Sequence, residues 1–162
     1  MITSIVVKNA VDSFATSIAL DTIDGSGVGY PLEVFSWHPV MDGADIGKMQ
    51  APGQWPWQKY VRNMPITIEG TILARTTTEY WTQRKALMNK CFPAPNNTVY
   101  DPIKIEMVID GDANTYYAFC VLDDAVGALD VETTHSPTVT KFQLSYSCRA
   151  GYWTGPTGLV IL

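Results

Sequence analysis

Hydrophobic and polar residues alternate with a period of two along much of this chain, a pattern typical of strands with one buried face. The clearest case is the segment 65–75, in which Ile66, Ile68 and Ile72 share one face. Gly70 interrupts this segment, and a glycine inside a strand predicts a β-bulge or the close approach of another part of the chain. The segment therefore predicts a half-buried strand.

Similar patterns predict strands elsewhere. Two alternating runs flank the turn sequence Gly-Asp-Ala-Asn and predict a hairpin, and other runs gather β-branched and aromatic residues. The hairpin covers residues 103–124, and the other strands cover residues 2–7, 18–24, 32–40 and 136–153. Residues 41–58 are rich in Gly, Pro and Asp, so they predict a long loop. A loop of this length is usually functional or ordered by a neighbour.

Only the segment 76–93 has the pattern of a helix. Thr76 and Glu79 have the spacing of a capping box, in which each side chain satisfies a backbone N–H at the start of the helix. Apolar residues at near-helical spacing predict a stripe that lies on a sheet, made of Tyr80, Trp81, Leu87, Met88 and Cys91. A nucleic-acid recognition helix is the alternative, but the basic residues are few. The elements together predict a mainly β fold, a β-sandwich with a single α-helix packed on it.

Composition and charge narrow the function classes. Charged residues make up 17% of the chain, against a typical value of about 25%, which suits a subunit buried among partners. The net charge is −5 and there is no basic stripe, which argues against a protein that holds nucleic acid through phosphate contacts. No apolar run approaches the roughly 18 residues of a membrane span. The start of the chain lacks a signal-peptide pattern, so we expect synthesis in the cytoplasm and no membrane partner.

Residue types that carry chemistry are sparse. His38 and His135 each lie next to or near a proline, without a second metal ligand at a suitable spacing. The three cysteines are widely spaced, which predicts free thiols. The segment 110–114 resembles the opening of a calcium loop but lacks the central glycine and the bidentate glutamate of an EF-hand. We therefore expect no enzymatic activity, no cofactor and no metal site.

Three aromatic residues in or beside the long loop are the candidate site. Trp55, Trp57 and Tyr60 lie among Gly and Pro residues. Aromatic side chains on a loop can anchor a protein interface, fold back as a lid on the core, or stack on a ligand such as a sugar. We take the interface as the leading interpretation. The alternative function is a carbohydrate-binding β-sandwich module that uses these loop aromatics, and a small hydrolase has almost no support in the sequence.

The order of the elements resembles the N-terminal belt domain of siphophage distal tail proteins. That domain has a strand with a glycine, a helix with an Arg and a Leu, a hairpin, and a last strand that reaches an aromatic pair. The corresponding residues here are Gly70, Arg84, Leu87, Tyr152 and Trp153. The resemblance covers residues 1–155, so we expect one belt-like β-sandwich domain there and a C-terminal tail at 156–162.

This resemblance implies a structural role in a phage tail. It implies a homo-oligomeric ring, commonly a hexamer in this family, that joins the tail tube to the baseplate or tail tip. Its partners would be the tail tube and the tail hub or tip proteins, and its location the virion. DNA would pass through its lumen without tight binding. A related tail-tube or tail-ring subunit remains an open alternative.

Overall fold

The structure is a computed structural model that describes residues 2–42, 46–47, 54–55, 60–94, 98–127 and 138–160. The elements follow one another as β1 (Ile2–Asn9), the 3-10 helix η1 (Ala10–Asp12), β2 (Ser17–Leu20), β3 (Leu32–Trp37), β4 (Val40–Asp42), β5 (Ile46–Gly47), β6 (Gln54–Trp55), β7 (Tyr60–Leu73), α1 (Thr77–Cys91), β8 (Ile103–Ile109), β9 (Thr115–Gly127), β10 (Val139–Cys148), β11 (Trp153–Gly155) and β12 (Gly158–Val160).

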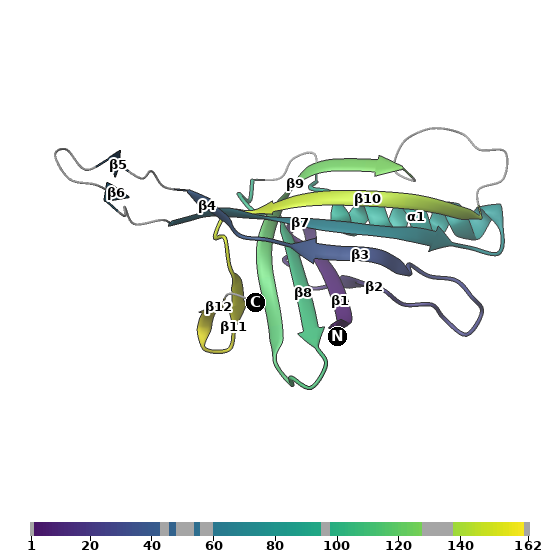
Figure 1. Ribbon diagram of the computed structural model, residues 1–162. Coiled ribbons are helices and arrows are strands. Elements are labelled where there is room, and N and C mark those ends of the chain that lie inside the picture. Colours follow the sequence, from purple (N-terminus) through teal and green to yellow (C-terminus); the bar gives the residue numbers. More distant parts are fainter. Residues whose placement is uncertain are drawn as a thin grey trace.

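The main strands form one continuous antiparallel path, β2-β1-β8-β9-β10-β7-β3, which bends at β9 so that its two halves make two sheets (Figure 1). The first sheet has the order β2-β1-β8-β9, with β11 and β12 beyond β9. The second has the order β9-β10-β7-β3, and β4 pairs with the start of β7. Figure 1 shows the strands of the first sheet running across those of the second, with α1 behind β7 and β10. The predicted fold class, a mainly β sandwich with one α-helix, is confirmed.

β9 belongs to both sheets. Its first half pairs with β8 as far as Cys120, and its second half pairs with β10 from Val121 onward. A register shift opposite Ser145 leaves Asp123 as the extra residue of a β-bulge. Figure 1 shows β9 following β8 and then turning to run along β10. This bend brings the apolar faces of the two sheets toward each other.

The core lies between the two sheets, where the period-two pattern places its apolar residues. The fully or almost fully buried side chains of the first sheet include Ile5, Val7, Leu20, Ile103, Ile105, Met107, Ala118 and Cys120. Those of the second include Ile66, Ile68, Ile72, Phe142, Leu144, Tyr146 and Cys148. The predicted strand at 65–75 therefore has its predicted face buried, and the alternating apolar residues of β8, β9 and β10 are buried in the same way.

Gly70 of β7 is a site of close approach, as its position in the strand predicts. A Cβ atom there would lie 2.7 Å from the Pro31 carbonyl oxygen and 2.9 Å from side-chain atoms of Leu32 and Phe142. The register of β3 against β7 shifts at the same place, leaving Glu33 as an extra residue. Glycine therefore lets β3 lie against β7 at this edge of the second sheet.

The start of α1 is capped as the sequence predicts. The Glu79 N–H donates to the Thr76 hydroxyl at 3.2 Å. In the usual capping box, the Glu carboxylate accepts from the N–H of the N-cap residue, here Thr76. The Glu79 carboxylate instead accepts from the N–H of Arg75, one residue earlier, at 3.0 Å. It also pairs with the Arg75 guanidinium at 2.7 Å. These contacts satisfy backbone donors that have no partner inside the helix.

The buried face of α1 differs from the predicted stripe at one position. Tyr80, Leu87 and Cys91 are buried, and Met88 is half-buried against the core. Trp81, in contrast, is 49% exposed and lies beneath the Arg84 guanidinium, 5.5 Å from its ring centre. The helix contacts β1, β2 and β7, so it touches both sheets, and this placement turns Tyr80 inward and Trp81 outward.

Two segments carry strands that the sequence did not predict. Part of the predicted 41–58 loop is extended, because β4 pairs with the first residues of β7 and β5 pairs with β6. Near the end of the chain, β11 and β12 form a short hairpin, so residues 158–160 of the expected tail are paired. Both pairings are short, and their residues are rich in Gly and Pro, which conceals the strand pattern.

Candidate assembly surfaces

Two of the three candidate aromatic residues lie in described strands that extend from the second sheet. Trp55 lies in β6 opposite Ile46, and Tyr60 begins β7 opposite Asp42. Trp57 lies outside the described residues. Figure 1 places β5 and β6 beyond the ends of β4 and β7, on the side of the molecule away from α1. The backbone thus brings Trp55 and Tyr60 to one projecting segment, and their role at an interface stays a prediction.

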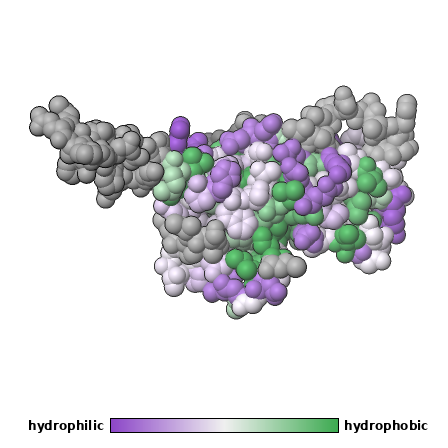
Figure 2. Space-filling model, in the orientation of Figure 1, coloured by the Kyte–Doolittle hydropathy of each residue, from purple (hydrophilic) through white to green (hydrophobic). Residues whose placement is uncertain are grey.

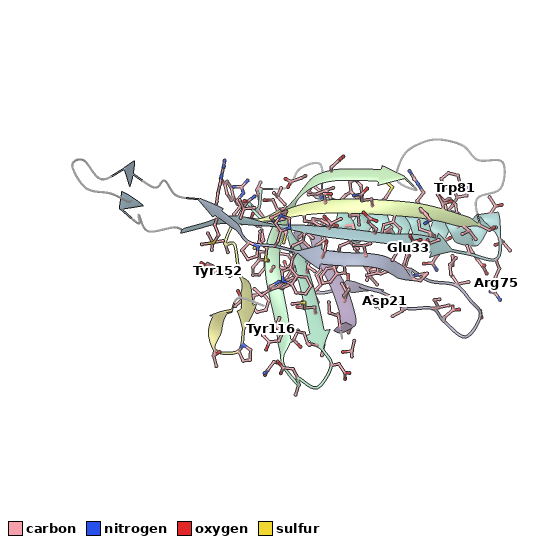
Figure 3. The ribbon with its side chains drawn as sticks, in the orientation of Figure 1. Asp21, Glu33, Arg75, Trp81, Tyr116 and Tyr152 are labelled. Carbon is pink, nitrogen blue, oxygen red and sulfur yellow. The ribbon has the colours of Figure 1, made fainter. Side chains whose placement is uncertain are left out.

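Two edge strands offer unpaired backbone groups. β2 ends the path of the first sheet and β3 ends that of the second. A sheet edge can pair with another chain unless charges, bulges or short length protect it. The β3 edge carries such protection, since the bulged Glu33 accepts from Lys141 at 2.8 Å and from the Thr71 hydroxyl at 3.2 Å. Asp21 and Glu33 both lie on the side of the molecule that carries the β3 edge (Figure 3).

The outer face of the first sheet carries a basic and aromatic cluster. The Glu106 carboxylate lies 2.9 Å from Lys8 and 2.6 Å from Lys104. The Lys104 ammonium also lies 4.4 Å from the ring centre of Tyr117 and 5.8 Å from that of Phe119. Burial raises the pKa of Glu106, but the hydrogen bonds from Lys104 and Lys8 outweigh burial, so its pKa lies below the usual value. The Glu106 carboxylate is therefore ionised at neutral pH.

Strand register explains how these residues meet. Lys8 of β1 lies opposite Lys104 of β8, which lies opposite Phe119 of β9. The neighbouring row runs through Glu106 to Tyr117. Tyr116, labelled in Figure 3, belongs to the other face of β9 and is buried. The sequence did not predict this cluster. Tyr117 and Phe119 alternate with buried residues, as on any half-buried strand, and only strand register brings Lys8 and Lys104 beside them.

The outer face of the second sheet is polar. A row of small and acidic residues crosses four strands, from Ser36 through Thr67 and Ser145 to Asp124. Next to it, Glu69 lies opposite Gln143. The two outer faces thus differ in chemistry. The first carries the basic and aromatic cluster, whereas the second is polar, with Glu69 and Asp124 as well as the Lys141–Glu33 ion pair.

Side chains suited to catalysis or metal binding are not brought together in the described part of the chain. No group of three His, Cys, Asp or Glu residues there could hold a metal ion. His38 lies between β3 and β4, and His135 falls outside the described residues. A groove of about 550 Å³ runs between η1 and the end of α1, lined mainly by apolar residues such as Val11, Met88 and Phe92. The only described α-helix, α1, does not meet the length and hydropathy needed to span a membrane.

Comparisons with known proteins bear on the fold. No family model matches the chain, and no curated protein matches it. Among solved structures, it is similar to the crystal structure of the Dit protein (gp 19.1) of phage SPP1, described as a paradigm of the hub adsorption apparatus in phages that infect Gram-positive bacteria. The TM-score is 0.53 at 9% sequence identity, and the match covers 95% of this chain and 53% of the Dit chain. This chain therefore spans about half the length of that protein, and the likeness shows a shared fold.

Proposed function

We propose that this chain is a structural subunit of a phage tail, which forms a ring joining the tail tube to the baseplate or tail tip. The observation that carries the proposal is the fold likeness to a phage hub protein over 95% of the chain. The order of elements in the sequence, which resembles the belt domain of siphophage distal tail proteins, also supports it. Fold alone does not fix function, so the surfaces of the molecule have to support the assignment.

Several surface features suit a ring subunit. A closed ring is built from heterologous contacts, in which two different surfaces of each copy meet. This chain has outer faces of unlike chemistry and a projecting ribbon at β4–β7. The face seen in Figure 2 is mostly hydrophilic, with several separate hydrophobic patches. In this proposal six copies form the ring, the tail tube and the tail hub or tip proteins bind its two ends, and the subunit acts without catalysis in the virion.

Native mass and location test the proposal. Sedimentation velocity of the purified protein should give a discrete oligomer, and six copies of 17.9 kDa would weigh 6 × 17.9 = 107.4 kDa. Immunogold labelling of the virions should place the chain where the tail tube meets the tip. A protein that stays monomeric at high concentration and does not occur in virions would contradict the proposal. Binding of glycans by such a monomer would instead favour the carbohydrate-binding module.

A further inference from the structure

A strained turn adds a third ring to the cluster on the first sheet. Ser13 and Phe14 have φ values of 55° and 61°, in the left-handed region that bulky side chains rarely adopt. Hydrogen bonds hold this turn, since the Ser13 N–H donates to the Ala10 carbonyl and the Phe14 N–H to the Asn9 carbonyl, each at 3.0 Å. The Phe14 ring lies edge-on to Phe119, with 5.5 Å between ring centres.

The turn is itself anchored to the fold. Asn9 is almost fully buried, and its side-chain amide donates to the backbone carbonyls of Asn89 and Phe92 at the end of α1. Asp12 accepts from the Lys90 ammonium at 2.6 Å. These contacts offset the backbone strain and hold Phe14 in place. Strained backbone held by surrounding contacts is a feature of binding sites.

The basic–aromatic platform, as we name it, consists of Lys8, Lys104, Glu106, Tyr117, Phe119 and Phe14. Tyr117 is edge-on to Phe119 at 5.6 Å, so the three rings are continuous. Phe119 is 40% exposed although it is aromatic, whereas the side chains of Lys8, Glu106 and Lys104 are only 25%, 15% and 21% exposed. A surface hollow of about 160 Å³ adjoins Glu106, lined also by Val6 and Thr115. Rigid aromatic residues surrounded by ordered polar groups are typical of interface centres.

Charge identifies the kind of surface that fits the platform. Its two lysines and one glutamate give +2 − 1 = +1, while the whole chain carries −5, so the rest of the chain carries −5 − 1 = −6. Outside the platform, another copy of the chain therefore carries more acidic than basic residues. One acidic site is the bulge in β9, where Asp123 and Asp124 are both exposed.

We propose that the basic–aromatic platform receives an acidic surface of the neighbouring copy, and so forms one side of the heterologous contact in the ring. This inference rests on the proposed function and adds the surface through which the copies meet. The aromatic rings supply the area removed from water, and the lysines select an acidic partner. Stacking of a sugar on the platform is less well supported, because the Lys104 ammonium already lies over the face of Tyr117.

Substitutions within and outside the platform test this inference. The test variants are Phe119→Ser and Lys104→Gln. The matched controls are Val139→Ser, an apolar residue that is 63% exposed on β10, and Lys141→Gln, a lysine paired with Glu33 on the other sheet. Sedimentation velocity should show self-association weakened by about tenfold or more in the test variants, with the controls unchanged. Circular dichroism establishes that each variant is folded.

A second measurement uses the unaltered protein. A mixture of ¹⁴N-labelled and ¹⁵N-labelled copies is treated with a carbodiimide, which joins ammonium and carboxylate groups in direct contact. Mass spectrometry should find Lys8 or Lys104 joined to an Asp or Glu of the other isotope. The inference is wrong if the wild-type ring forms but these lysines join only to Glu106 of their own copy. It is also wrong if the test variants assemble like wild type. In both cases the proposed ring is unaffected. If the wild-type protein stays monomeric, the ring and the inference both fail.

Discussion

At the scale of single residues, Leu87 links the helix to the rest of the molecule. Its side chain is fully buried where α1 meets β1, β2 and β7. Leu87→Ala would remove buried methyl groups and leave a cavity, so the free energy of unfolding should fall by about 2–5 kcal/mol. Chemical denaturation measures the change. Lys85→Ala, at an exposed position of the same helix, is the control and should alter it by less than about 0.5 kcal/mol. Equal midpoints for wild type and Leu87→Ala would show that this side chain does not support the fold.

Thr76 contributes through a hydrogen bond rather than through packing. Its hydroxyl accepts from the Glu79 N–H at the start of α1. Thr76→Ala leaves that donor to solvent and should lower the free energy of unfolding by about 1 kcal/mol. Thr77→Ala, one residue later and exposed, provides the comparison in the same denaturation assay. A loss of similar size in both variants would mean that general helix propensity, and not the cap, is the cause.

The cysteines give a residue-level test of burial. All three are free and fully buried. Burial raises the pKa of the Cys91 thiol to about 12, whereas a hydrogen bond with Cys120 lowers the pKa of Cys148 to about 7. Because all three cysteine side chains are buried, a thiol reagent cannot reach them in the folded state. We expect a thiol reagent such as DTNB to label native protein slowly and all three cysteines after unfolding. Rapid labelling of native protein at Cys91 would contradict this burial.

At the scale of elements, alternation and capping were strong enough to predict most of the fold. The strand at 65–75, the hairpin at 103–124 and the helix could be predicted because their own residues specify them. β4 could not be predicted, because its pairing depends on how far β7 extends. The outward position of Trp81 depends on the rotation of α1 against two sheets, and residues 80 and 81 both fit the apolar stripe.

The candidate site was harder to predict than the fold. The loop aromatics stand out in sequence because they lie among Gly and Pro residues. The platform does not, because its residues come from three strands and a turn that meet only through register. The strained conformation of Phe14 has no sequence signal, since neither Ser13 nor Phe14 is a glycine or asparagine.

The ribbon at β4–β7 yields a prediction at this scale. If Trp55 and Trp57 anchor an assembly contact, the double substitution to Ser should reduce ring formation and leave the fold unchanged. Sedimentation velocity measures the first property and far-UV circular dichroism the second. Trp81→Ser, on the exposed side of α1, is the matched control for loss of a tryptophan. Loss of the fold together with the ring would favour the lid interpretation of the loop aromatics.

At the scale of the whole molecule, the distribution of charge bears on what the proposed ring does with DNA. Genomic DNA would have to pass through the lumen without being held there. Tight binding of a duplex draws on Lys and Arg contacts to phosphates and weakens steeply with salt. A hexamer of this chain would carry 6 × (−5) = −30. The outer face of the second sheet would suit the wall of such a lumen, because it presents the uncharged Thr67 and Ser145 and the acidic Asp124 in one row.

We therefore expect the assembled protein not to bind duplex DNA at physiological salt. Charges on such a lining would repel the DNA backbone only over about 8 Å, the Debye length at that salt, so DNA could occupy the channel without strong exclusion. Fluorescence anisotropy of a labelled duplex measures DNA binding. The informative variant is Glu69→Lys, because Glu69 lies on the outer face of the second sheet, opposite Gln143. If that face lines the channel, the variant ring should bind DNA in a salt-dependent manner while the wild-type ring does not. Salt-dependent micromolar binding by the wild-type ring would instead show that a basic surface, such as the one around Lys8 and Lys104, faces the lumen.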